Sequence, residues 1–208
     1  MPLVPGYGET PVSGDELDAL LPSARELLGA PITLAAVYDL EQAVQEQVVE
    51  EQVTAVLEGR VRLDALLTDS FLRDLHAQLY QDVWSWAGLL RKSELNIGVA
   101  PEQVAIELRT SMDTIRYRWE HTSDWTAREL GIVAHAEAVR IHPFVDGNGR
   151  STRLLADLVF VAAQDGEAIQ QYDWEIDKTR YISLLRKYDA SRDIRELAAF
   201  IPIRQLEE

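Results

Sequence analysis

Residues 142–153, HPFVDGNGRSTR, bring together the side chains needed to bind and react a phosphate compound. The glycines at 147 and 149 allow backbone conformations that other residues avoid, and they let a ligand approach the main chain closely. Arg150 and Arg153 are three apart, so on one helix both guanidinium groups can reach the same side of a site. Two cations beside the free N–H groups of a helix start are typical of an oligophosphate site.

An acid and a base complete this set. Asp146 would repel phosphate unless a cation lay between them, and Mg²⁺ commonly bridges one carboxylate to substrate phosphates. His142, with an ordinary pKa of about 6.5, can be neutral and take a proton from an attacking hydroxyl. Together with the amides of the Gly-Asn-Gly turn, these groups predict transfer of a phosphorus group from a nucleotide.

Other interpretations of these residues stay open. A Gly-Asn-Gly turn between helices can be ordinary turn chemistry, with His142 as a cap, Phe144 in the core and the arginines in solvent. The chain has no GxxxxGK[ST] loop, so this is not a Walker-type phosphate site. His135 shares a helix face with His142 but lacks a third ligand, which argues against zinc. His76 and His121 are interpreted as structural or surface residues.

The elements that must position these residues are mostly helices. Apolar residues at helical spacing predict a helix from about Thr33 that ends at Gly59 and a second from about Asp69. Helical spacing resumes after Pro101, and another helix begins near Ser123 or Asp124. That helix should end at His142, because a residue before proline is pushed out of the helical region. Further helices are predicted from residue 150 and near 173–188 and 192–200.

Two helical stripes and one interruption refine this layout. The first helix carries its stripe at Val37, Leu40, Val44, Val48 and Val53. The helix after the turn should face the core with Leu154, Leu155, Leu158, Val159 and Ala162. Between them, the glycines at 88 and 98 break the helical period and indicate a turn or a small hairpin. The sequence therefore predicts a mainly α fold with one candidate hairpin.

Composition limits the class of protein. The chain has 208 residues, no cysteine and a formal net charge of −15, which argues against a nucleic-acid surface and excludes disulfides and thiolate metal sites. No stretch is apolar enough to span a membrane, and we expect a single-domain cytoplasmic protein. Residues 1–30 hold four of the eight prolines and four of the eleven glycines, so we expect a flexible arm there. A homo-oligomer is left open.

The 142–153 segment resembles the signature of the Fic (Fido) proteins, HPFx(D/E)GNGRxxR, at every specified position. The segment FLRDLHAQLYQDVWSWAGLLRKSELNIG also resembles the one that precedes the active site in short bacterial Fic proteins, including a hairpin called the flap. The resemblance covers roughly residues 60 to 190. There is a looser likeness to the group called mobile mystery protein B.

The resemblance implies a helical Fic fold with a small β-hairpin flap, and the transfer of AMP from ATP to a Ser, Thr or Tyr hydroxyl of a target protein. His142 would be the general base, and Asp146 would hold Mg²⁺ between the α and β phosphates. Gly147, Asn148 and Gly149 would form the anion hole, while Arg150 and Arg153 would hold the β and γ phosphates. The flap would dock the target by adding a strand; its residues are Ser93, Glu94, Leu95, Asn96, Ile97, Gly98 and Val99.

Different chemistry remains conceivable on the same scaffold. Doc toxins, which phosphorylate their targets, carry lysine at the second glycine of the turn, so Gly149 favours nucleotidyl transfer. The alternatives are a donor other than ATP, phosphorylation of the target, a non-catalytic module that binds a nucleotide or a partner, and a helical regulator. The acidity and the lack of a basic recognition helix argue against the regulator.

A second, weaker resemblance concerns regulation. Many Fic proteins are inhibited by a helix bearing (S/T)xxxE(G/N), and TAVLEG at 54–59 fits this pattern with Thr54, Glu58 and Gly59. The resemblance implies that Glu58 pairs with Arg153 and displaces the γ phosphate. The alternative is that Glu58 is an exposed residue that ends an acidic helix. The implied division is an arm at 1–30, an N-terminal helix at 31–59, and a Fic core with C-terminal helices at 60–208.

Overall fold

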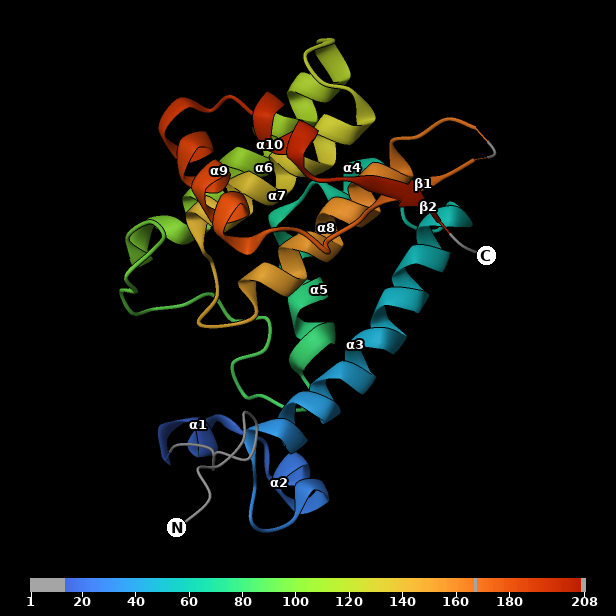
Figure 1. Ribbon diagram of the computed structural model, residues 1–208. Coiled ribbons are helices and arrows are strands. Elements are labelled where there is room, and N and C mark those ends of the chain that lie inside the picture. The colour runs from blue at the N-terminus through green and yellow to red at the C-terminus, as the bar shows by residue number, and fades with distance from the viewer. Residues whose placement is uncertain (1–13, 167, 207–208) are drawn as a thin grey trace.

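The computed structural model describes residues 14–166 and 168–206, and the fold is mainly α (Figure 1). The elements that form the site are the helices α3 (Leu34–Leu57), α5 (Asp69–Tyr80), α7 (Ala127–Ile141) and α8 (Asn148–Ala162). The other helices are α1 (Gly14–Ala19), α2 (Pro22–Leu28), α4 (Leu63–Leu66), α6 (Val104–His121), α9 (Lys178–Ser191) and α10 (Arg195–Phe200), with a 3-10 turn at Pro101–Gln103. The strands β1 (Gln170–Tyr172) and β2 (Ile203–Gln205) pair antiparallel, with Gln171 opposite Arg204.

Helices α7 and α8 form the centre of the molecule. Every residue of α7 from Leu130 to Ala138 is buried, which is why its sequence shows no single apolar stripe. In α8 the predicted core positions Leu154, Leu155, Leu158 and Val159 are buried, and Ala162 packs at the edge of the same core. Because both helices are held on several sides, the turn that joins them is anchored at each end.

The long helix α3 crosses the molecule diagonally and packs against α5 and α8 (Figure 1). Thr33 caps its start by accepting a hydrogen bond from the amide of Ala36, and Gly59 follows its end with a φ of 71°, as the sequence predicts. The predicted stripe faces inward: Val37 and Val48 are buried, and Leu40, Val44 and Val53 pack against the core. One further residue on this inner face, Glu41, is charged and 2% exposed.

The start of α7 differs slightly from the sequence prediction. The helix begins at Ala127 rather than near residue 124, because Thr126 and Glu129 form a capping box. The Thr126 hydroxyl accepts from the amide of Glu129, and the Glu129 carboxylate accepts from the amide of Thr126. The predicted end is confirmed, because the helix stops at Ile141 and His142 adopts a left-handed conformation before Pro143.

The loop at residues 89–99 contains no strand, so the hairpin expected there is not formed in the described structure. The small sheet is built instead by β1 and β2, near the C-terminal end of the chain (Figure 1). The buried side chain of Arg91 explains the difference, because it hydrogen bonds the carbonyls of Ser93, Val99, Ile141 and His142. These hydrogen bonds from the guanidinium hold the two ends of the loop together, as the hydrogen bonds between two paired strands would in a hairpin.

The N-terminal segment is more ordered than the expected arm. Residues 1–13 lie outside the described residues, but residues 14–28 form α1 and α2. The amide of Leu21 donates to the carbonyl of Val83, and the amide of Ser85 donates to the carbonyl of Ala19. Leu20 and Ala24 enter the main core, so apolar burial holds this segment despite its glycines and prolines.

Within the described ranges, no helix combines the length and the apolar character required to cross a lipid bilayer.

Candidate active site

The turn between α7 and α8 is locked by the side chain of Asn148. Its Oδ1 accepts from the amide of Phe144 at 2.9 Å, and its Nδ2 donates to the carbonyl of the same residue at 2.8 Å. Asn148 is buried, and Phe144 is fully buried. The side chain of Asn148 therefore fixes the loop, which leaves the anion-binding role expected of this position to its backbone amide.

Three backbone amides at the start of α8 are free to bind an anion. In the described structure the N–H groups of Asn148, Gly149 and Arg150 donate to no protein acceptor, and the first amide bonded into the helix is that of Ser151, which donates to the carbonyl of Gly147. Such unpaired amides at a helix start attract anions. The amide of Gly147 is used differently, because it donates to Oδ1 of Asp146 at 2.6 Å.

Glycine is required at position 147. Its φ is 73°, and a Cβ there would lie 2.5 Å from Cε2 of Tyr80, which is fully buried. The turn therefore lies directly on the ring of Tyr80 at the end of α5, and no residue larger than glycine fits at position 147. Gly149 is different: a Cβ there would meet only Nη1 of Arg153 at 3.6 Å, so this glycine leaves open space next to the free amides.

His76 supports the turn from below. The amide of Gly88 donates to its Nδ1 at 2.9 Å, so the proton must be on Nε2, which donates to the carbonyl of Asp146 at 3.0 Å. The imidazole also stacks on Phe144, with ring centroids 3.6 Å apart. Burial lowers the pKa of His76 to about 4, so it is neutral at ordinary pH. The sequence indicates a structural or surface role for His76, and no local pattern reveals its contact with Asp146, which lies 70 residues farther along the chain.

The surroundings of His142 favour its neutral form. Its left-handed backbone is held by the Arg91 side chain, whose Nε donates to the His142 carbonyl at 2.7 Å. Burial and the charge of Arg91 lower the pKa of His142, and the carbonyl of Val139 and the carboxylate of Asp146 oppose that shift. Nδ1 is buried, so Nε2 is the ring nitrogen that solvent and a substrate can reach.

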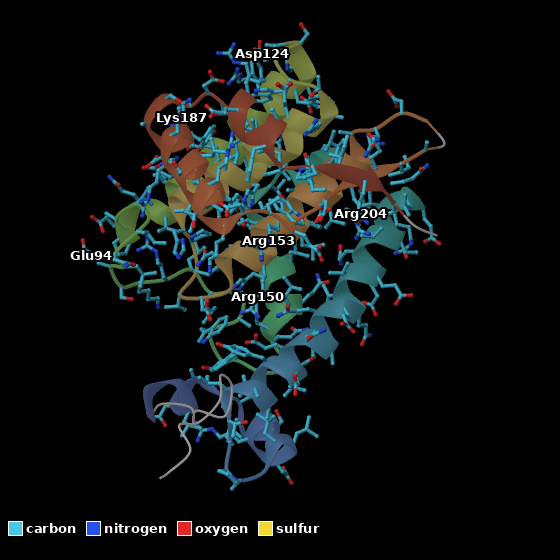
Figure 2. The ribbon with its side chains drawn as sticks, viewed as in Figure 1. Glu94, Asp124, Arg150, Arg153, Lys187 and Arg204 are labelled. Carbon is cyan, nitrogen blue, oxygen red and sulfur yellow. The ribbon has the colours of Figure 1, made fainter. Side chains whose placement is uncertain are left out.

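The two arginines lie one turn apart on α8, as predicted, but their partners differ (Figure 2). Arg150 lies over the ring of Tyr80 at 4.9 Å and forms an ion pair with Glu41 of α3. The other carboxylate oxygen of Glu41 accepts from the indole of Trp84 at 2.6 Å. Arg153 forms no ion pair with any described carboxylate. Arg150 thus already has an anionic partner from the protein, whereas Arg153 has none.

The segment expected to inhibit lies elsewhere. Glu58 caps the end of α3, is exposed, and pairs with Arg60 at 2.6 Å rather than with Arg153. Thr54 and Gly59 are exposed at the same end. This end is about 25 Å along the helix axis from Glu41, since each residue adds about 1.5 Å. The pairing expected for Glu58 is therefore absent, and Glu41 makes the contact between α3 and an arginine of α8.

Asp146 could hold a divalent ion that arrives with phosphates. Its carboxylate is exposed, and only Oδ1 is occupied, by the amide of Gly147. The described chain has no cluster of three His, Cys, Asp or Glu residues that could bind a metal alone. A single carboxylate next to a phosphate site suits Mg²⁺, which retains water and takes its other ligands from the substrate.

Comparisons with known proteins agree with this geometry. A model of the Fic/DOC family matches residues 66–160, which include the turn, both arginines and His76. The chain contains a Fic domain. Among solved structures, the Fic domain of a Bep effector from Bartonella quintana has a TM-score of 0.62 at 15% identity, covering 82% of each chain. BepC from Bartonella tribocorum, solved with AMPPNP, has a TM-score of 0.58 at 17% identity, covering 82% of this chain and 88% of that one. At such identity these likenesses establish the fold.

Curated relatives of this Fic domain are longer proteins. Protein adenylyltransferase fic-1 of Caenorhabditis briggsae is 37% identical over 79 residues, which is 36% of this chain and 15% of the relative. Protein adenylyltransferase Fic of Drosophila melanogaster is 45% identical over 49 residues, which is 22% of this chain and 10% of the relative. The matched segments therefore span only a small part of these relatives.

We expect His76→Phe to lower the free energy of unfolding of the protein. Phenylalanine preserves the stacking on Phe144 but leaves the amide of Gly88 and the carbonyl of Asp146 without partners, which should cost roughly 2–4 kcal/mol at pH 7.5. Thermal unfolding at pH 7.5 and pH 5 measures this. An unchanged midpoint would contradict the assigned hydrogen bonds.

The folding stability of the same variant should fall less with decreasing pH than that of the wild type. The folded pKa of His76, about 4, lies below its ordinary value of 6.5, so the unfolded chain takes up the proton first. The stability that His76 contributes is complete above pH 6.5 and is lost as pH falls towards 4. The variant should lack this part of the loss and retain the parts due to other groups whose pKa is lowered in the fold, among them His135, whose pKa burial lowers to about 3, and His142.

Proposed function

We propose that this Fic domain transfers AMP from ATP to a Ser, Thr or Tyr hydroxyl of a target protein. The observation that carries the proposal is the close arrangement of three unpaired amides, two arginines and a neutral histidine around one turn. The names of the curated relatives, protein adenylyltransferase, support the reaction. The AMPPNP in BepC supports a nucleoside triphosphate as donor. The use of ATP suits the cytoplasmic setting that the sequence suggests.

The phosphates would follow the first turns of α8. The amides of Asn148, Gly149 and Arg150 would bind phosphate oxygens without reorganising, because the Asn148 side chain already fixes the turn. Arg153, which has no carboxylate partner, would hold the phosphate farthest from His142. Asp146 would hold Mg²⁺, which when bound neutralises phosphate charge.

The nucleoside would occupy a recess of about 430 Å³, one of whose lining residues, Gly98, adjoins His142. Its wall comes from the loop, α7 and α9, with Ile97, Gly98, Ala136, Val139 and Leu185 among the lining residues. The α phosphate must lie within reach of the attacking hydroxyl and hence near His142, so the attached nucleoside belongs at that end. Gly98 is the residue of this wall that adjoins His142, because a Cβ at position 98 would lie 2.7 Å from Cβ of His142.

His142 would take the proton of the target hydroxyl at Nε2. The hydroxyl oxygen forms a bond to the α phosphorus, the bond from that phosphorus to the bridging oxygen breaks, and pyrophosphate leaves. Because burial lowers the pKa of His142 below its ordinary value of 6.5, the base should be unprotonated at neutral pH, and activity should decline as pH falls below 6.5. The free amides would stabilise the charge that develops on the phosphate oxygens.

The target would dock on the loop at Ser93–Val99. Residues 93–98 are exposed, and the backbone groups of residues 94–98 bond to no described residue. Arg91 fixes both ends of this exposed segment. An extended target segment could therefore pair with this backbone and bring its hydroxyl to His142, a mode that places few demands on target side chains.

We further propose that α3 restrains the site through Glu41 and not through Glu58. Glu41 is 2% exposed and already occupies Arg150, so a phosphate must compete with a carboxylate that Trp84 holds in place. In this proposal α3 still has the inhibitory role expected of it, but the role belongs to Glu41 and Arg150 instead of Glu58 and Arg153. Glu58 is occupied by Arg60 in solvent and has no such contact.

The reaction is tested with α-labelled ATP, magnesium and host lysate. Label should appear on protein with the wild type and be lost with His142→Ala, which removes the base but keeps the carbonyl that Arg91 binds. Asp146→Ala should also lower the signal strongly. Mass spectrometry of the labelled protein should show the mass of one AMP. Label that persists undiminished in His142→Ala would contradict the assignment of the base.

The restraint is tested by comparing Glu41→Gln with Glu58→Gln. Glutamine at 41 can still accept from Trp84 but no longer neutralises Arg150, so the KM for ATP should fall about tenfold, or ~1.4 kcal/mol. Glu58→Gln removes the same charge at the other end of the helix and should leave KM unchanged. A KM that responds to Glu58 and not to Glu41 would overturn the assignment.

A further inference from the structure

A second recess lies at the Arg153 end of the site and is not used by ATP in the proposed reaction. It has a volume of about 480 Å³ and is lined by Arg153, Trp174, Ile176, Lys178, Tyr181 and Ile182. Arg153 lies five residues along α8 from Asn148, or roughly 8 Å farther from the turn. A triphosphate that starts near His142 and ends at Arg153 would stop at the entrance of this recess.

The aromatic walls of the recess are fixed from behind. The Trp174 indole donates to Oδ2 of Asp157 at 2.9 Å, and the other oxygen of Asp157 accepts from the amide of Tyr172. The Tyr181 hydroxyl shares a hydrogen bond of 2.5 Å with Nε2 of His135, which is fully buried. Rings held in this way lose little freedom when a planar ligand stacks on them.

The charge of the recess is positive, although the chain carries −15 overall. Lys178, like Arg153, forms no ion pair with a carboxylate in the described parts of the chain. The guanidinium of Arg153 lies 5.9 Å from the centre of the Trp174 ring, so a cation and a stacking surface adjoin. These features suit an aromatic ring joined to phosphate, a combination found in a nucleotide.

We propose that this recess binds the distal nucleoside of a dinucleoside polyphosphate, which the domain uses as an AMP donor. The inference rests on the proposed AMP transfer. With diadenosine tetraphosphate, the target oxygen bonds to the first phosphorus, the bond to the next bridging oxygen breaks, the proton passes to His142, and ATP leaves in place of pyrophosphate. The distal base stacks on Trp174, and Lys178 and Arg153 bind the phosphates next to it.

A target peptide is a poorer occupant of this recess. The exposed loop at Ser93–Val99 and the base His142 lie at the other end of the phosphate site, where a target hydroxyl must be placed. The recess is lined by Arg153, and its lining includes neither His142 nor a residue of that loop. The recess therefore determines which donor is preferred and what its leaving group is.

The binding test uses His142→Ala, so that no transfer occurs, and titrates it with ATP and with diadenosine tetraphosphate in the presence of magnesium. Diadenosine tetraphosphate should bind at least about tenfold more tightly, within the range of one stacked base. Adding Lys178→Gln or Trp174→Ala should remove most of this difference. Lys187→Gln removes the same charge from another face of α9, where Lys187 pairs with Glu196, and should preserve it.

Equal or weaker binding of diadenosine tetraphosphate, or a preference that survives Lys178→Gln and Trp174→Ala, would overturn the inference. Transfer by the otherwise wild-type chain is measured in parallel, with ATP release as the readout for the dinucleotide. AMP transfer from ATP without a preference for the dinucleotide removes only this inference. Nucleotide binding with no transfer from either donor removes the proposed reaction, and the binding ratio still decides the role of the recess.

Discussion

The double hydrogen bond between the Asn148 side chain and the backbone of Phe144 is the constraint on which the site depends. It closes the turn between two helices whose own positions are fixed by burial. Because the turn cannot relax, the amides of α8 stay oriented towards the space where phosphates would lie. His76 adds a second restraint on the same turn, from α5 to the carbonyl of Asp146. A preorganised site of this kind does not have to reorient its dipoles during reaction.

The ion pair between Glu41 and Arg150 links the N-terminal helices to this turn. A buried carboxylate needs its partners, and here both oxygens are satisfied, one by Arg150 and one by Trp84. Such a pair contributes little net stability compared with an apolar contact, so stability alone does not account for it. The same arginine cannot bind a phosphate and remain fully paired with Glu41. In the proposed reaction, the arrangement of α3 on α8 would therefore affect how the donor binds.

The local geometry of residues 142–153 follows from the sequence because these residues are close along the chain and their spacing determines how they are placed. The end of a helix at His142 and the glycine after α3 follow from local backbone preferences, and the structure has both. The contacts of Glu41, His76 and Arg91 join segments far apart in the sequence, so local patterns do not reveal them. A signal existed for Glu41, which is a charged residue on the otherwise apolar face of α3.

The hairpin expected at residues 93–99 is a local prediction that the structure does not bear out. Glycines and short apolar runs indicate a chain reversal at residues 88–98, and the chain does reverse there. A chain reversal can be stabilised by pairing between two strands or by a side chain that bonds the backbone. Here the buried guanidinium of Arg91 donates hydrogen bonds to the carbonyls of Ser93 and Val99. The pairing expected between Glu58 and Arg153 is not formed, and Glu58 pairs with Arg60 instead, because a short pattern fixes a residue's place on a helix but not which neighbour it contacts.

The proposed reaction requires that the target hydroxyl activated by His142 attacks the α phosphorus. The most direct measurement compares transfer of label to protein from α-labelled and γ-labelled ATP in parallel reactions. We predict that protein acquires label from the α position and none from the γ position. Label from the γ position alone would mean that the nucleotide binds in the reverse direction along α8, and would contradict attack at the α phosphorus.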